Sequence, residues 1–153
     1  MTTRFVHVNL TAKDWRSLSR FYQEVFGCVP APPRREQSGP ALARGTAVPG
    51  ARLEGEHLRL PGSADGAGPT LEIYTYGETL PKPPAAANRA GFGHLAFEVA
   101  DVRAALARLL AAGGREHGEV VTLAVPGKGA VTFTYALDPE ENLIELQSWS
   151  EAT

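Results

Sequence analysis

The chain has 153 residues, of which 43% are hydrophobic and 21% charged, as in an ordinary soluble globular protein. The net charge of −2 argues against a nucleic-acid surface, and no apolar run approaches the ~20 residues of a membrane span. The N-terminus leads directly into a predicted strand without the apolar core of a signal peptide. These features favour a cytoplasmic protein that binds neither nucleic acid nor membrane.

The first predicted elements are a strand and a helix. Residues 5–10 alternate between two faces, which predicts a strand with His7 on the less apolar face. Asp14 follows at the position of a helix N-cap, and Gly27 stands where a helix C-terminus favours glycine. Between them, apolar residues recur at helical spacing and predict a helix that covers a sheet: Trp15, Leu18, Phe21, Tyr22, Val25 and Phe26.

Residues 28–50 are rich in proline and polar side chains, and we expect an irregular segment. Such a segment is either a lid or binding loop or a mobile surface excursion. Within it, Ser38 is expected to cap a short helix that has Pro40 in its first turn. Two strands follow at residues 53–60 and 70–76, joined by a turn rich in glycine, and they form a hairpin.

The second half begins after a linker of proline and alanine at residues 77–90. Residues 91–102 read as a strand with His94 on its less apolar face, and Asp101 is the N-cap of a helix that ends at Gly113 and Gly114. Three further strands are predicted at residues 120–125, 131–137 and 143–149.

The second half repeats the first. The strand histidine, the helix cap and the terminal glycine all recur at one spacing, since 94 − 7, 101 − 14 and 114 − 27 each give 87. The last strand also recurs, with Glu72 matching Glu145 at a spacing of 73, and the 14 missing residues fall in the proline-rich region. We therefore predict two βαβββ modules, at residues 4–76 and 91–149, which pair into one α+β domain of 153 residues. The linker is long enough for the modules to pair within one chain or to exchange between two chains.

Each module offers one histidine and one glutamate on the face opposite its aliphatic positions. The aliphatic face must pack against the following helix, so His7, Glu72, His94 and Glu145 point the other way and converge if the modules curve around one cavity. Carboxylates in a cavity are costly unless they are paired or bound to a cation. Two imidazoles and two carboxylates neutralise a divalent ion, and this mixed set suits Zn, Ni, Co, Mn or Fe.

Other candidates carry weaker signals. His57 and His117 have no partner in the repeat, and surface or turn positions explain both. Glu54 and Glu56 lie on the strand before Glu72, and either could face the cavity because the face of that strand is ambiguous. Tyr74, Tyr76 and Trp149 either wall a pocket or simply pack.

The chain resembles the vicinal oxygen chelate superfamily, which includes glyoxalase I, methylmalonyl-CoA epimerase, extradiol dioxygenases and the fosfomycin and bleomycin resistance proteins. The motifs that carry the resemblance are His7 in Phe5-Val6-His7-Val8, Glu72 in Leu71-Glu72-Ile73, His94 in residues 93–99 and Glu145 in residues 138–146. The resemblance implies two βαβββ modules that form a half-open, barrel-like sheet around a metal. Glu141 departs from the family turn, which usually has glycine there.

A set of four ligands looks most like glyoxalase I, while the epimerase has glutamine in the place of Glu72. The resemblance then implies a divalent-metal-dependent isomerase, lyase or epimerase that moves a proton next to a carbonyl through a metal-bound enediolate, with Glu72 or Glu145 as the base. The alternatives are an Fe(II) extradiol-type dioxygenase and a metal-free protein that binds small molecules such as drugs. The resemblance also implies a small-molecule substrate and a homodimer.

Overall fold

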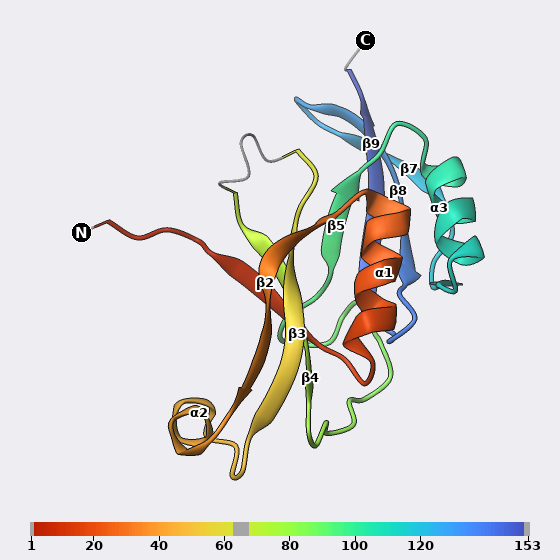
Figure 1. Cartoon of the computed structure of the whole chain (residues 1–153). Coiled ribbons are helices and arrows are strands. Elements are labelled where there is room, and N and C mark those ends of the chain that lie inside the picture. The colour runs from red at the N-terminus through yellow and green to blue at the C-terminus, as the bar shows by residue number, and fades with distance from the viewer. Residues whose placement is uncertain (1, 63–67, 152–153) are drawn as a thin grey trace. The chain divides into compact units, whose positions relative to one another are not determined.

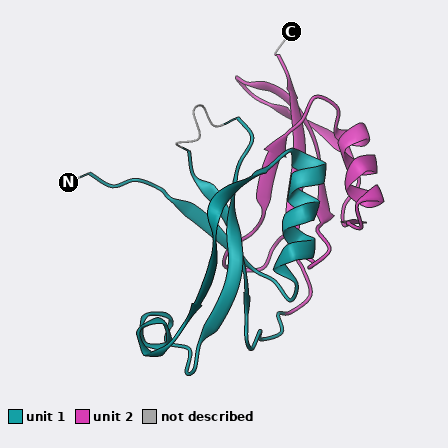
Figure 2. Ribbon diagram, viewed as in Figure 1, with its two compact units in different colours: residues 1–82 teal, residues 83–153 magenta. Residues whose placement is uncertain are grey.

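The structure is a computed structural model that describes residues 2–62 and 68–151. It divides into two compact units, residues 1–82 and 83–153, each with its own sheet (Figure 2). The boundary falls inside the predicted linker. No helix among the described residues is long and apolar enough to cross a membrane. Part of the turn expected between the hairpin strands, residues 63–67, lies outside the described residues.

Unit 1 contains a four-stranded sheet and two helices (Figure 1). The strand order is β1-β4-β3-β2, with β1 parallel to β4 and the other neighbours antiparallel. The elements are β1 (His7–Thr11), α1 (Trp15–Phe26), β2 (Val29–Ser38), α2 (Pro40–Thr46), β3 (Arg52–Arg59) and β4 (Thr70–Tyr76).

Helix α1 packs against β3 and β4 and closes one face of this sheet. Its buried side chains include Leu18 and Tyr22, and Leu58, Leu71 and Ile73 of the two strands are also fully buried. Both predicted ends of the helix are confirmed, since the Asp14 carboxylate accepts from the amides of Arg16 and Ser17 and Gly27 has a φ of 69°. The opposite face of the sheet is thereby left to the polar residues of β1 and β4.

The expectation of an irregular segment over residues 28–50 was wrong. The segment holds the ten-residue strand β2 and the seven-residue helix α2. Proline is tolerated there because β2 is an edge strand, whose outward amides need no partner, and because the register shifts between Ala31 and Arg35. The short helix α2 is confirmed with Pro40 at its start, but its N-cap is Gly39, and the side chain of Ser38 does not cap it.

Unit 2 repeats this plan with a five-stranded sheet of order β5-β9-β8-β6, in which β7 also pairs with β8. Helix α3 packs against β6, β8 and β9, and the predicted N-cap Asp101 accepts from the Ala104 amide. The elements are β5 (Leu95–Glu98), α3 (Val102–Ala111), β6 (Arg115–Glu116), β7 (Val121–Val125), β8 (Gly129–Leu137) and β9 (Leu143–Ser150). The predicted α+β class is confirmed.

The strand registers repeat with the same offsets as the sequence. In unit 1 Val8 pairs with Leu71, and in unit 2 Leu95 pairs with Ile144. The differences, 95 − 8 and 144 − 71, are the 87 and 73 that align the two halves of the sequence. Hydrogen-bond register is independent of residue type, so this agreement supports the internal duplication.

The turn before β9 holds a strained residue. Glu141 has a φ of 64°, a conformation that glycine adopts freely and other L-residues adopt at a cost of about 1 kcal/mol. Glu141 also forms an ion pair with Arg115, but both side chains are more than half exposed and such pairs contribute little.

We therefore expect Glu141→Gly to raise the free energy of unfolding by roughly 0.5–1 kcal/mol, measured by urea denaturation. Glu141→Ala is the matched control, because it removes the same ion pair while keeping the Cβ, and it should bring no gain. Equal stabilities for the two variants would show that the turn is not strained.

Candidate metal centre

Glu72 lies at the centre of a polar cluster in unit 1. Its Oε1 accepts a hydrogen bond from Asn9 Nδ2 at 2.9 Å and lies 3.7 Å from His7 Nε2. Its Oε2 lies 2.9 Å from His57 Nε2. The pairing of the strands explains the geometry, since Asn9 on β1 and His57 on β3 are the register partners of Glu72 on β4. Side chains from β1 and β3 thus meet a carboxylate on β4, the strand between them.

His57 was not among the metal ligands predicted from the sequence. It lies within β3 with only 15% of its side chain exposed, so the expected surface or turn position was wrong. Its structural counterpart in unit 2 is a tyrosine, because Tyr135 pairs with Glu145 as His57 pairs with Glu72. Because unit 2 has tyrosine at this position, the repeat of histidines in the sequence does not include His57. The strand register identifies the two positions as equivalent.

Burial lowers the pKa of His57, opposed by the Glu72 carboxylate and reinforced by the charge of Arg35. A lowered pKa favours the neutral imidazole, which is the form that binds metals. Tyr74 lies beside it, with its hydroxyl 3.3 Å from His57 Nε2. Burial and the nearby Glu72 carboxylate raise the pKa of Tyr74 to about 12, so this phenol stays protonated at neutral pH.

Unit 2 holds the second predicted pair. His94 immediately precedes β5, and its Nε2 lies 2.9 Å from Oε2 of Glu145 on β9. The ring of Tyr135 lies edge-on to His94 at 5.0 Å, much as His57 lies edge-on to His7 at 5.5 Å. Burial, with the Glu145 carboxylate as a smaller cause, raises the pKa of Tyr135.

The structure therefore brings His7 to Glu72 and His94 to Glu145, each pair within its own unit. The convergence of all four on one ion stays a prediction. Glu54 and Glu56 do not join the cluster and instead turn toward α1. Glu56 is 5% exposed and accepts a hydrogen bond from Ser19 Oγ, while Glu54 accepts from the Trp15 indole. His117 is exposed, as expected.

The donor set fits a divalent transition metal. One ligand atom each from His7, His57 and Glu72 all lie within 4.8 Å of one another. Imidazole nitrogen combined with carboxylate oxygen suits Mn, Fe, Co, Ni and Zn. His57 Nδ1 lies 2.8 Å from the Thr70 hydroxyl, which can accept a hydrogen bond from Nδ1–H when Nε2 binds a metal.

Comparison with known proteins agrees with this fold. Residues 4–146 match the model of the Glyoxalase/Bleomycin resistance protein/Dioxygenase superfamily. No curated protein matches significantly. Among solved structures, a glyoxalase family protein from Bacillus cereus is 21% identical with a TM-score of 0.73, over 99% of this chain and 94% of that one.

A fosfomycin resistance protein from Listeria monocytogenes, FosX, is 19% identical with a TM-score of 0.59, over 98% of this chain and 96% of that one. Its complex with Mn(II) and sulfate is 17% identical with a TM-score of 0.53, over 98% and 95% of the two chains. At such identities the likeness establishes the fold alone, whereas the family model matches nearly the whole chain. The chain belongs to the Glyoxalase/Bleomycin resistance protein/Dioxygenase superfamily.

Proposed function

We propose that this protein is a divalent-metal-dependent enzyme of the glyoxalase I type, which transfers a proton next to a carbonyl of a small molecule. The observation that carries the proposal is the duplicated His–Glu contact, His7 with Glu72 and His94 with Glu145. These four side chains would hold the ion, which supplies the positive charge that stabilises an enediolate oxygen. The complex of a structural neighbour with Mn(II) supports the choice of a divalent metal.

The two glutamates differ in how firmly they are held. Glu72 accepts a hydrogen bond from Asn9 and also contacts His57 and His7, which fixes its carboxylate from three sides. Glu145 has a single ion-pair partner among the described residues, His94. A base must move to take a proton from one carbon and return it to another. We therefore assign the role of the base to Glu145. Glu72 would remain a fixed ligand of the ion, and His57 and Asn9 would position it.

The test is solvent-deuterium incorporation. Protein loaded in turn with Mn, Fe, Co, Ni or Zn is incubated in deuterium oxide with a panel of 2-oxo hemithioacetals and acyl thioesters. We expect exchange at the carbon next to the carbonyl, reduced about 100-fold or more in Glu145→Gln. Glu98→Gln, which alters an exposed glutamate on β5, is the matched control and should leave the rate unchanged. An exchange rate no higher than without protein across the panel would refute the proposal.

A second candidate function rests on the cluster in unit 1. His7, His57 and Glu72 alone form a set of two histidines and one carboxylate, the composition of non-haem Fe(II) oxygenase sites. An Fe(II) extradiol-type dioxygenase would consume oxygen in the presence of catechols and would lose activity in His57→Ala. The proton-transfer enzyme would show no such oxygen uptake.

A further inference from the structure

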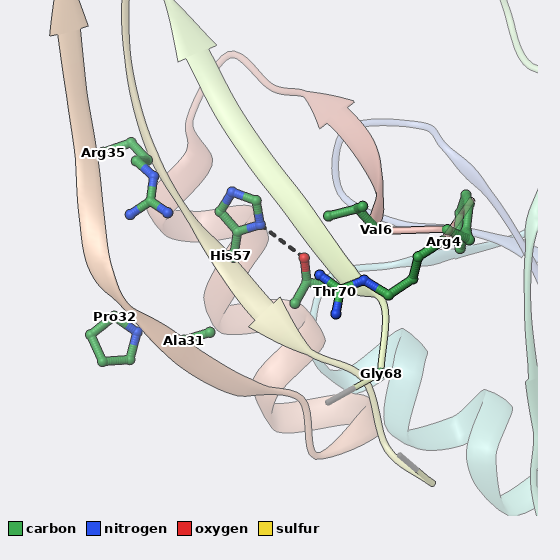
Figure 3. Close-up of a pocket in the computed structure, with 9 residues that line it drawn as sticks. Arg4, Val6, Ala31, Pro32, Arg35, His57, Gly68 and Thr70 are labelled. Carbon is green, nitrogen blue, oxygen red and sulfur yellow. Dashed lines mark hydrogen bonds between the residues drawn. The ribbon is translucent and has the colours of Figure 1, made fainter. Parts of the chain in front are cut away.

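A pocket in unit 1 adjoins the Glu72 cluster. Its volume is about 340 Å³, within the range of pockets that hold small molecules. The polar part of its wall consists of Arg4, Arg35, His57 and Thr70. The apolar part consists of Phe5, Val6, Ala31 and Pro32. Figure 3 shows the side chains of Arg4 and Arg35 directed into the space around His57 and Thr70.

The pocket carries two positive charges and no carboxylate among the described residues that line it. Guanidinium groups stay protonated and offer five donors each. Three other arginines pair with glutamates: Arg16 with Glu54, Arg34 with Glu56 and Arg115 with Glu141. Within the described chain, Arg4 and Arg35 form no such ion pair, and Arg35 donates only to the carbonyl of Pro33. Most of their donors are therefore left for a ligand.

His57 forms the wall between this pocket and the cluster. Its Nδ1 contacts Thr70, which lines the pocket, while its Nε2 contacts Glu72. A group held by Arg4 and Arg35 would therefore lie one imidazole ring away from the carboxylate of Glu72. That separation suits one small molecule that places an anionic end in the pocket and its reacting part at the cluster.

We propose that this pocket binds the anionic group, a carboxylate or a phosphoryl group, of the substrate. That the ligand is the substrate rests on the proposed function, whereas binding of an anion in this pocket requires no metal. Two arginines suit oxyanions because each guanidinium can donate two parallel hydrogen bonds to a pair of oxygens. The apolar wall would then contact the carbon skeleton next to that group.

The first test measures anion binding to metal-free protein, prepared over a chelating resin, by NMR titration with inorganic phosphate and with acetate. We expect saturable binding of at least one of them. The anion that binds more tightly identifies the class of the anionic group. Arg35→Gln should weaken it at least about tenfold, and Arg4→Gln/Arg35→Gln should weaken it further. Arg20→Gln, which removes the same charge from an exposed position on α1, is the matched control and should bind as the parent does.

No saturable binding of either anion, or equal affinity in the parent and the double variant, would overturn the proposal. Arg35→Lys guards against a folding defect, because it keeps the charge while losing the fork, and it should bind with intermediate affinity. Because no metal is present, failure of the anion site and failure of metal binding are separate results. In the deuterium assay, the double variant should raise KM for anionic substrates while leaving kcat, and the KM of their neutral esters, unchanged.

Discussion

Glu72→Ala and Glu145→Ala should each remove the bound divalent ion completely, although the two residues lie in different units of the chain. This result would follow from the proposed single site with four ligands, in which the loss of either carboxylate would leave three protein ligands and an uncompensated charge. We expect a fall in affinity of at least about 100-fold for each variant. The measurement is metal content per chain by elemental analysis after dialysis, with one ion per chain expected for the parent protein.

The same measurement distinguishes the alternatives. If each His–Glu pair bound an ion of its own, each variant would lose half of the metal and the double variant all of it. If the ion belonged to unit 1 alone, His94→Ala would keep it, whereas His57→Ala would lose it. Glu98→Ala is the matched control in unit 2, because Glu98 is an exposed glutamate on the strand that follows His94. Any metal loss in that control would point to unfolding of unit 2.

The elements that the sequence predicted well carry local chemical signals. Asp14 and Asp101 cap helices because a short carboxylate after a strand meets free amides, whatever the rest of the chain does. The repeat of the two halves was also visible, because His7 and His94 keep one spacing and the strand registers follow it. The candidate pairs His7–Glu72 and His94–Glu145 could be found for that reason.

Two features depended on tertiary context. Strand β2 contains three prolines, which oppose a strand in the middle of a sheet, and only its place at the edge makes them acceptable. Whether His57 points to the Glu72 cluster depends on which face of the sheet its side chain occupies. The register of β3 with β4 sets that face. Glu54 and Glu56 looked equally suitable for the cavity, and the same register turns them toward α1.

Gly55 leaves room on β3 for the Tyr74 ring and the Ile73 carbonyl of the neighbouring strand. It lies on β3 opposite Tyr74, two residues before His57 and therefore on the same face of the sheet. A Cβ added there would lie 2.0 Å from the Ile73 carbonyl oxygen and 2.5 Å from Tyr74 Cδ1. The oxygen belongs to the backbone of the neighbouring strand, so no change of rotamer can relieve the contact.

We therefore expect Gly55→Ala to lower the free energy of unfolding by about 3 kcal/mol, which corresponds to a fall in Tm of about 6–12 °C. The measurement is thermal and urea unfolding followed by circular dichroism. Gly45→Ala on α2 is the matched control, because nothing lies within 4 Å of its added Cβ. That variant should keep the parent stability or gain up to about 1 kcal/mol, as alanine does in helices.

The defect should also reach the cluster. Tyr74 packs across Gly55, and its hydroxyl lies 3.3 Å from His57 Nε2, so a displaced ring takes away one neighbour of that imidazole. Removing the ring with Tyr74→Ala should restore only part of the lost stability, because the clash with the Ile73 carbonyl remains. Full recovery in Gly55→Ala/Tyr74→Ala would show that the ring alone had caused the strain. An unchanged Tm in Gly55→Ala would show that β3 and β4 lie further apart than the structure places them.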